Sequence, residues 1–580
     1  MVDTISFQTK TWLENASMVG LTRVASDGDY QVDRNKVELN VSALDNFADK
    51  YFHYFIRTYG KYTRYWHIID FESTLKSWQD HDFEDFNQDK LKILIDYFNN
   101  QIKYSFLGSM KSFKTVAKLL NDDFDVVQKA KDCNAIVKKL SRKNAWTKYS
   151  EESLEEVKDV VQRLIDIIEY LKSDRASNYY PAQLLIYMII QNGWNNTAFL
   201  DAANNKIPDF YQSYDVNFVQ PVRDYLQADH DNDKFNCSVC GRPFIKRDKD
   251  GFRVTFVNGM GYDYGKKKSN AWNFQNDYYI CPICHLMYTL IPAGFTYNQF
   301  HQGIFINATP MIAGLKNAND AVLNRMTNAI SEGQSMSSYK ALASAFEREA
   351  VRSQQYPLAN IQLITYDDEK YDFKIVSSVA GKTLKEASSI SFKTGRTLLE
   401  SLQKIGIANY QGQNYYNVYN EIIKRILNNT DLSSIIYTLE MLKAAGDSGA
   451  YYGTSNIMNV ITLNSIFLNA LSKQKGENNM QISEEDLRKC RSYGIRIRDG
   501  YANKSNANKS QALSYRMLEA LRTGNSSRFM DLMLNAYLYL GMIVPSIFIN
   551  NQDKTKAFKQ YGYAFVSGLI GSTNTETKEN

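Results

Sequence analysis

The chain has 580 residues, of which 44% are hydrophobic and 23% are charged, and its formal net charge is +5. This composition excludes a disordered or fibrous protein, and the length predicts roughly two to four domains. Six cysteines are too few for a disulfide scaffold. The N-terminus lacks an apolar signal, and the most apolar runs, Leu184–Ile190 and Leu538–Ile549, are shorter than the roughly 20 residues that span a bilayer. We therefore expect a soluble, intracellular protein without a membrane segment.

The first 230 residues fall into two regions of different pattern. Residues 1–110 alternate short apolar runs with aromatic segments, which predicts a mixed α/β region, whereas residues 111–230 predict mostly helix. The clearest helix begins at Ser153, where Ser153 and Glu156 form a capping-box pattern. Its apolar residues recur at helical spacing and predict one buried stripe, made of Val157, Val160, Val161, Leu164, Ile168 and Leu171.

The middle of the chain is divided at about residue 300. Residues 231–300 contain two cysteine pairs, and residues 301–400 return to a mixed α/β pattern. Within the second of these regions, the strand-like runs Ile361–Tyr366 and Tyr371–Ser377 flank the polar segment Asp367–Lys370. Two such runs with a short polar connection predict a β-hairpin.

The last region, residues 401–580, predicts a helical domain that ends in a basic bundle. No proline occurs between Pro357 and Pro545, and helix interiors reject proline strongly. Ser483 followed by Asp486 predicts an N-terminal cap. Four amphipathic segments follow the helical period: Asn456–Leu471, Glu484–Ala502, Gln511–Arg522 and Ser527–Leu540. The predicted fold class is α+β, mainly helical, with a mixed N-terminal region, a four-cysteine module and a C-terminal helical bundle.

The cysteine pairs predict one structural zinc site. Cys237 and Cys240 form one CxxC turn, and Cys281 and Cys284 form a second after 40 intervening residues. Each turn directs two thiolates at one ion, and two turns complete the sulfur tetrahedron that suits Zn²⁺. Four thiolates leave no position for a catalytic water. A redox CxxC needs no matched second pair, whereas an iron–sulfur cluster also takes four cysteines and stays an alternative.

The segment between the pairs combines positive charge with groups that contact bases. Three lysines there can neutralise phosphates, and the asparagines can form hydrogen bonds to base edges. The tryptophan can stack on a base or insert between two bases. An ordinary solvated loop with a core tryptophan is the alternative interpretation. The hypothesis of DNA contact names Lys266, Lys267, Lys268, Asn270, Trp272 and Asn273.

The net positive charge is concentrated at the C-terminus. Residues 480–580 carry 14 Lys and Arg against 9 Asp and Glu, which equals the whole net charge of the chain. Within this part, Leu487–Arg528 has 10 basic and 2 acidic residues. Such an excess predicts a polyanionic partner, although a solvated helical face neutralised by other parts of the fold is the alternative. The candidate contacts are Arg488, Arg491, Arg496, Arg498, Lys504, Lys509, Arg516, Arg522 and Arg528.

The sequence resembles the CRISPR-associated CXXC–CXXC family, the large subunit of type I-B Cascade complexes. The cysteine pairs carry the specific part of this resemblance. Softer similarity is spread over most of the chain, in Trp12–Gly20, Leu286–Phe295, Phe529–Tyr537, Gly541, Pro545 and Tyr563–Gly568.

The resemblance implies a role in antiviral defence in the prokaryotic cytoplasm. A large subunit of this kind binds the handle of the guide RNA and double-stranded target DNA, and recognises the motif beside the target. It also holds the displaced strand, contacts the backbone and small subunits, and recruits a separate helicase-nuclease. In such complexes base pairing with the guide reads the sequence, while protein reads the adjacent motif. The basic C-terminal helices are then expected to follow the displaced strand.

Two other functions are weaker interpretations. A metal-dependent nuclease needs clustered His and Asp ligands, and the only His-Asp pairs are His81-Asp82 and His230-Asp231, both in polar segments. Gly446–Gly449 matches the sequence of a serine nucleophile turn, but no His lies near it in the sequence. We therefore expect no intrinsic catalysis. A stand-alone zinc protein that binds nucleic acid outside any CRISPR system is the second alternative.

The codons before Met480 suggest a second product. Lys475–Glu477 can be encoded by a purine run that resembles a bacterial ribosome-binding site at workable spacing, and some relatives make a small subunit from inside the gene. We predict that cells make a product of residues 480–580 and that replacing the Met480 codon abolishes it, as seen on a blot for the C-terminus. Persistence of the short band after that replacement would rule out this start.

Overall fold

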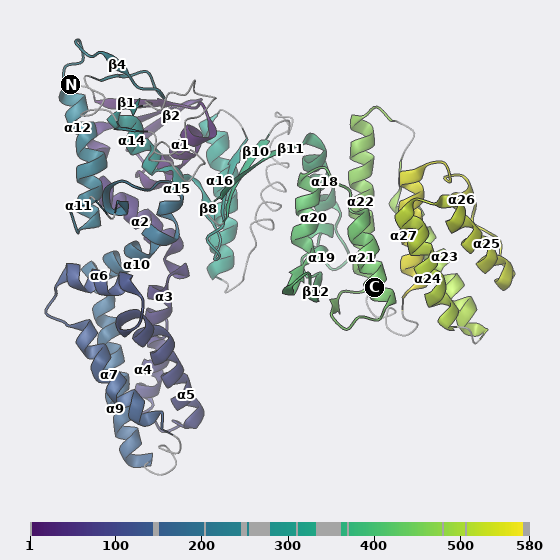
Figure 1. Ribbon diagram of the computed structural model, residues 1–580, viewed down its shortest axis with the longest axis horizontal. Helices are drawn as coiled ribbons and strands as arrows, with labels where there is room; N and C mark the ends of the chain where they lie inside the picture. The colour runs from purple at the N-terminus through teal and green to yellow at the C-terminus, as the bar shows by residue number, and fades with distance from the viewer. Residues whose placement is uncertain are drawn as a thin grey trace. The chain divides into compact units, whose positions relative to one another are not determined.

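The computed structural model describes residues 3–142, 150–201, 203, 205–244, 252–253, 279–308, 311–331, 361–367, 370–477, 481–504 and 507–571. Helices make up 65% of the structure, which confirms the predicted mainly helical α+β class (Figure 1). The chain divides into two compact units, Met1–Ser335 with Ile364–Asp372, and Met336–Leu363 with Phe373–Asn580.

Most of the described strands lie in the first unit, together with the helices α1 to α16. Its helices are α1 (Trp12–Val24), α2 (Phe47–Tyr59), α3 (Arg64–Ile69), α4 (Glu72–Asp80), α5 (Gln88–Tyr97), α6 (Lys111–Leu120), α7 (Val126–Leu140), α9 (Ser150–Leu171), α10 (Asp174–Met188), α11 (Phe210–Tyr214), α12 (Gln220–Gln227), α14 (Pro282–Thr289), α15 (Ile291–Gly294) and α16 (Ile312–Ser331). Its strands are β1 (Thr4–Gln8), β2 (Tyr30–Asp33), β3 (Lys36–Asn40), β4 (Phe235–Asn236), β5 (Pro243–Phe244), β6 (Phe252–Arg253), β7 (Tyr279–Ile280), β8 (Thr296–Tyr297), β9 (Gly303–Asn307) and β10 (Ile361–Asp367).

Two hydrophobic cores form within this unit. One core lies among the helices from α3 to α10, where α9 packs against α7 and α4 (Figure 1). The other joins α1, α2, the sheet β1-β3-β2 and the four-cysteine region. The cysteine module is therefore part of a core and not an appendage.

The predicted stripe on α9 is confirmed, because Val157, Val160 and the other four apolar residues are all buried. The predicted cap is wrong. The helix begins at Ser150, so Ser153 lies inside it and is only 5% exposed. The polar residues Ser150, Glu151 and Glu152 extend the helix before Ser153, so the Ser153–Glu156 spacing lies within the helix and not at its N-terminus.

A close backbone crossing joins α1 to α15 in the second core. A Cβ atom at Gly20 would lie 2.1 Å from the carbonyl oxygen of Leu290, and one at Gly294 would lie 2.0 Å from that of Ala16. Only glycine allows this approach. The buried guanidinium of Arg23 donates from Nη1 to the carbonyl oxygens of Ala293, Gly294 and Phe295, and from Nε to Asp320, which lies 2.9 Å away.

The predicted hairpin is confirmed as the neighbouring strands β10 and β11 (Lys370–Val376) in the sheet β11-β10-β9-β8. In the second unit, four helices match the predicted amphipathic segments: α22 (Thr454–Gln474), α23 (Glu484–Asn503), α24 (Ala507–Thr523) and α25 (Ser526–Leu540). Ser483 caps α23 as predicted, accepting a hydrogen bond of 3.0 Å from the Asp486 amide. The remaining helices of the unit are α18 (Ser378–Ser389), α19 (Leu398–Leu402), α20 (Val418–Leu427), α21 (Ser433–Ala444), α26 (Ser546–Ile549) and α27 (Thr555–Leu569).

The helical prediction for residues 401–580 missed a small sheet. It has the order β13-β12-β14, formed by β12 (Gly406–Tyr410), β13 (Gln413–Asn417) and β14 (Ala450–Tyr451). Its strands are short and polar, so they carry no clear alternating pattern. The helices α23 and α27 pack backbone to backbone, because a Cβ at Gly494 would lie 1.9 Å from the carbonyl oxygen of Phe565.

The glycine crossing predicts a specific loss of stability. Gly294→Ala should destabilise the first unit by about 1–3 kcal/mol, because the added methyl group meets backbone that cannot move aside. Thermal unfolding followed by circular dichroism measures the effect. Gly60→Ala is the matched control, since the nearest atom to its Cβ is a side-chain carbon of Ile56 at 3.9 Å. Equal melting temperatures for the two variants would contradict the tight crossing.

Candidate metal centre

The first cysteine pair lies on the turn between β4 and β5, which pair Phe235 with Phe244. The Cys237 amide donates to the Arg242 carbonyl oxygen at 2.8 Å and closes the turn, while Gly241 adopts φ +77°. A positive φ of this size favours glycine. The amides of Val239 and Cys240 point at the Cys237 sulfur, at 3.4 and 3.5 Å. Backbone N–H groups aimed at a sulfur stabilise its thiolate form.

The second pair lies where β7 runs into α14. Cys281 is the N-cap residue, Pro282 occupies the first turn, and Cys284 follows one turn later. Proline suits this position because the first helical residue needs no N–H donor. The amide and hydroxyl of Ser238 both donate to the Tyr279 carbonyl oxygen at 3.0 Å, which ties the two turns together.

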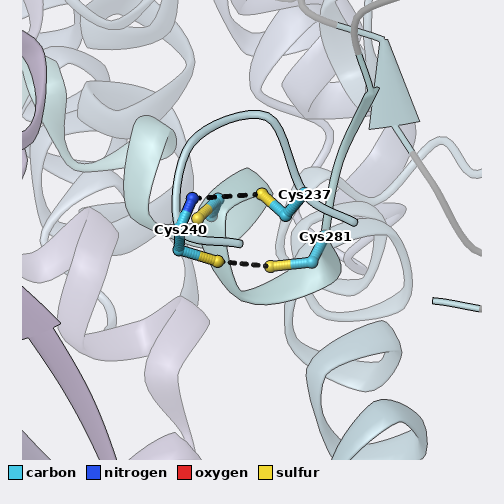
Figure 2. Close-up of side chains that lie close together, drawn as sticks. Cys237, Cys240 and Cys281 are labelled. Atoms are coloured by element: carbon cyan, nitrogen blue, oxygen red, sulfur yellow. Dashed lines mark hydrogen bonds between the residues drawn. The ribbon is translucent and has the colours of Figure 1, made fainter. Parts of the chain in front are cut away.

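The two turns bring all four sulfurs together. The four Sγ atoms lie within 4.8 Å of one another, and those of Cys240 and Cys281 are 3.6 Å apart (Figure 2). Zinc–sulfur bonds of about 2.3 Å in a tetrahedron place the sulfurs about 3.8 Å apart. Cys237, Cys281 and Cys284 are buried, and Cys240 is partly exposed. The cluster therefore has the spacing and the chemistry to hold a metal ion such as zinc.

The four thiols affect one another's protonation. Hydrogen bonds from Cys240, Cys281 and Cys284 hold the pKa of Cys237 well below its ordinary value. Hydrogen bonding with Cys237, Cys240 and Cys281 raises the pKa of Cys284 well above it. Neighbouring thiolates repel one another, so the four groups cannot all ionise together without compensation. A divalent cation would stabilise all four thiolates.

The first turn is also attached to the N-terminal strand. The Lys10 ammonium donates to the Val239 carbonyl oxygen at 2.6 Å. The Arg242 guanidinium donates to the Ser6 carbonyl oxygen and lies 5.9 Å from the centre of the Phe7 ring. The cysteine turn, β1 and the segment before α1 thus form one packed unit.

Neither nearby histidine belongs to the sulfur cluster. His230 bonds through Nδ1 to Asp233 at 2.6 Å and through Nε2 to the Tyr225 carbonyl oxygen at 2.8 Å. Burial opposes the charged form of His230, but the bond to Asp233 leaves its pKa raised overall. His285 is fully buried, which lowers its pKa to about 3, and its ring stacks on Phe252 at 3.8 Å.

The six predicted contacts between Lys266 and Asn273 lie outside the described residues. Several C-terminal cations pair with acids: Arg488 contacts Glu484, Arg498 contacts Asp499 and Arg522 contacts Glu519. Arg491 donates to the Thr454 hydroxyl at 3.1 Å. The predicted positive surface is therefore partly neutralised at its own helices.

The other predicted cations lie on exposed parts of α23, α24 and α25. Arg516 and Arg528 are exposed. Arg496 lies 5.9 Å from the centre of the Tyr493 ring, and Lys504 and Lys509 both lie over the Tyr539 ring. Tyr493 and Tyr539, which a count of charges does not reveal, are interleaved with these basic residues in the sequence and lie against them in the structure.

A metal analysis tests the centre directly. We predict one zinc per chain by elemental analysis, lost together with stability when Cys281 is replaced by Ser, because a ligand and a buried thiolate disappear. Cys133→Ala and Cys490→Ala are the controls, since both thiols are buried away from the cluster. Stoichiometric iron with absorbance near 400 nm would instead indicate an iron–sulfur cluster.

The four-cysteine region matches a known protein family. Residues 230–296 match the family model of the CRISPR-associated protein Cas_CXXC_CXXC, and this range contains all four cysteines. No curated protein and no solved structure matches the chain. Among the residues that the structure describes, no helix is both long and apolar enough to cross a membrane. The family match supports a place among the CRISPR-associated CXXC–CXXC proteins and favours this assignment over a stand-alone zinc protein.

Proposed function

We propose that the chain is the large subunit of a type I-B CRISPR surveillance complex. The match over residues 230–296, in a module whose four sulfurs converge, carries this proposal. The module lies in a core with α1 and α14–α15, which contain the segments Trp12–Gly20 and Leu286–Phe295 that resemble the same family. Those two segments meet at the Gly20–Gly294 crossing and therefore contact one another.

The proposed role is binding and not cleavage. If Cys237, Cys240, Cys281 and Cys284 bind zinc, their four sulfurs would fill its tetrahedral coordination and leave no position for an activated water, as in structural zinc sites. The partners would be the guide RNA, double-stranded target DNA with its displaced strand, the backbone and small subunits, and a separate helicase-nuclease. Exposed cations on α23–α25 supply the charge that phosphate contacts require. Recognition of the adjacent motif is proposed for Lys266–Asn273.

Purification from the native host tests this function. We predict that a tagged chain recovered at moderate salt brings down discrete guide RNAs and the subunits that form the backbone of the complex. The tag alone serves as the control. A chain that purifies without RNA, under conditions that preserve known complexes, would overturn the proposal. Incubation of the purified chain with DNA and Mg²⁺ should leave the DNA intact, because the protein would recruit its nuclease.

A further inference from the structure

One sulfur of the four-cysteine cluster can be reached from a cavity. Cys240 is partly exposed, whereas Cys237, Cys281 and Cys284 are buried. A cavity of about 240 Å³ lies among β1, α1, α14 and the first cysteine turn, and Cys240 forms part of its wall. Cys284 also borders this cavity but is only 5% exposed. On the β1 side the wall includes Gln8, which is exposed. A water molecule takes up about 30 Å³, so the cavity has room for a small solute beside the Cys240 sulfur.

Positive charge lies near this partly exposed sulfur. Lys10 and Arg242 line the same cavity, together with one acidic residue, Glu14. The Glu14 carboxylate accepts a hydrogen bond of 2.9 Å from the Tyr288 hydroxyl. The backbone amide of Arg242 points at the Cys240 sulfur at 3.5 Å. Two cations at one cavity favour the departure of a negatively charged group from a molecule that reacts there.

The Cys240 sulfur is also in contact with a thiol of the other turn. Its Sγ atom lies 3.6 Å from that of Cys281 (Figure 2). A disulfide has an S–S length of about 2.05 Å, so the two sulfurs need to approach each other by only about 1.6 Å. The Cys237 sulfur instead faces two backbone amides of its own turn, at 3.4 and 3.5 Å. A bond between Cys240 and Cys281 would therefore link the two turns across the 40 intervening residues.

We propose that Cys240 is a modification site at which a hydroperoxide oxidises the cluster, and that Cys281 then forms a disulfide with it. In the first step the Cys240 sulfur attacks one oxygen of hydrogen peroxide and the O–O bond breaks. Cys240 becomes a sulfenic acid, and the departing hydroxide takes a proton from the thiol, or from solvent if the sulfur is a thiolate, and leaves as water.

The second step joins the two turns. The Cys281 sulfur attacks the Cys240 sulfur, the S–S bond forms as the S–O bond breaks, and hydroxide again takes up a proton and leaves as water. Overall, two cysteines lose two electrons and one hydrogen peroxide is reduced to two waters.

The disulfide would exchange one link between the turns for another. A sulfur in a disulfide is no longer a thiolate ligand, and the two remaining cysteines cannot complete a tetrahedral zinc site. Oxidation would therefore release a bound metal ion, while a covalent bond keeps the two turns together. A dithiol reductant reverses the reaction by exchange and restores the four thiols. The inference concerns the cluster itself and does not depend on the CRISPR assignment.

Disulfide mapping on the full chain tests the modification site. The reduced protein is treated with hydrogen peroxide, its remaining thiols are blocked with N-ethylmaleimide, and its peptides are analysed by mass spectrometry. We predict that the first disulfide joins Cys240 to Cys281, and that dimedone added with the peroxide labels Cys240 before any other cysteine. Bound zinc, followed with a metal-binding dye, should be released at the same rate. Cys133 and Cys490 are buried away from the cluster and should stay free thiols.

Narrowing the cavity tests the route of the oxidant. Gln8→Trp places a large ring in the cavity wall and leaves all four sulfurs in place, so it should slow disulfide formation several-fold without lowering the zinc content. Thr4→Trp is the matched control, because Thr4 is exposed on the same strand and does not line the cavity. This control should be oxidised at the wild-type rate. If Gln8→Trp fails to fold, the disulfide map of the wild type decides the question.

Three results would overturn the proposal. They are a first disulfide within one turn, four free thiols that persist in peroxide, and equal oxidation rates in the two tryptophan variants. A chain that holds no zinc but forms the bond between Cys240 and Cys281 would keep the modification site and refute the metal prediction. Recovery of guide RNA from the host tests the proposed function separately, because none of these measurements involves a nucleic acid.

Discussion

The backbone contact between Gly20 and Gly294 is the constraint on which the first unit depends. It lets α1 and α15 approach until backbone atoms touch, and it leaves the carbonyl oxygens at the end of α15 within reach of Arg23. Tyr51 on α2 donates to the Thr289 carbonyl oxygen at 2.8 Å, and Tyr54 to that of Ala293 at 3.1 Å. Buried carbonyl groups almost always accept a hydrogen bond in folded proteins. The crossing therefore determines where α2 packs as well.

The sulfur cluster lies at the N-terminal end of α14, and the glycine crossing lies in α15, which follows it. Cys281 and Cys284 begin α14, whose continuation in α15 reaches the crossing at Gly294. Lys10 and Arg242 connect the first cysteine turn to the strand that precedes α1. A metal bound by the four sulfurs would thus join two turns separated by 40 residues, and Lys10 and Arg242 connect the first of these turns to a strand more than 200 residues earlier in the sequence. Its stabilising effect would extend over the core and beyond the turns themselves.

The sequence predicted the structure correctly where a pattern of residues has a single physical cause. The CxxC spacing predicted the convergence of four sulfurs, and the helical period predicted α22–α25, because both signals are local. The role of Arg23 could not be predicted, since its acceptors lie some 270 residues away. The ion pairs of Arg498 and Arg522 were missed for a different reason. A charge count over a segment does not show which acids lie beside which bases on a helix.

The pairing of β6 with β7 has a consequence for how this module can evolve. Phe252 lies opposite Ile280, and Arg253 lies opposite Tyr279, so residues 252–253 and 279–280 are held side by side. A segment anchored in this way can be lengthened, shortened or exchanged while its base stays closed. The length and composition of the chain between β6 and β7 could therefore change between relatives while the sulfur cluster is inherited unchanged.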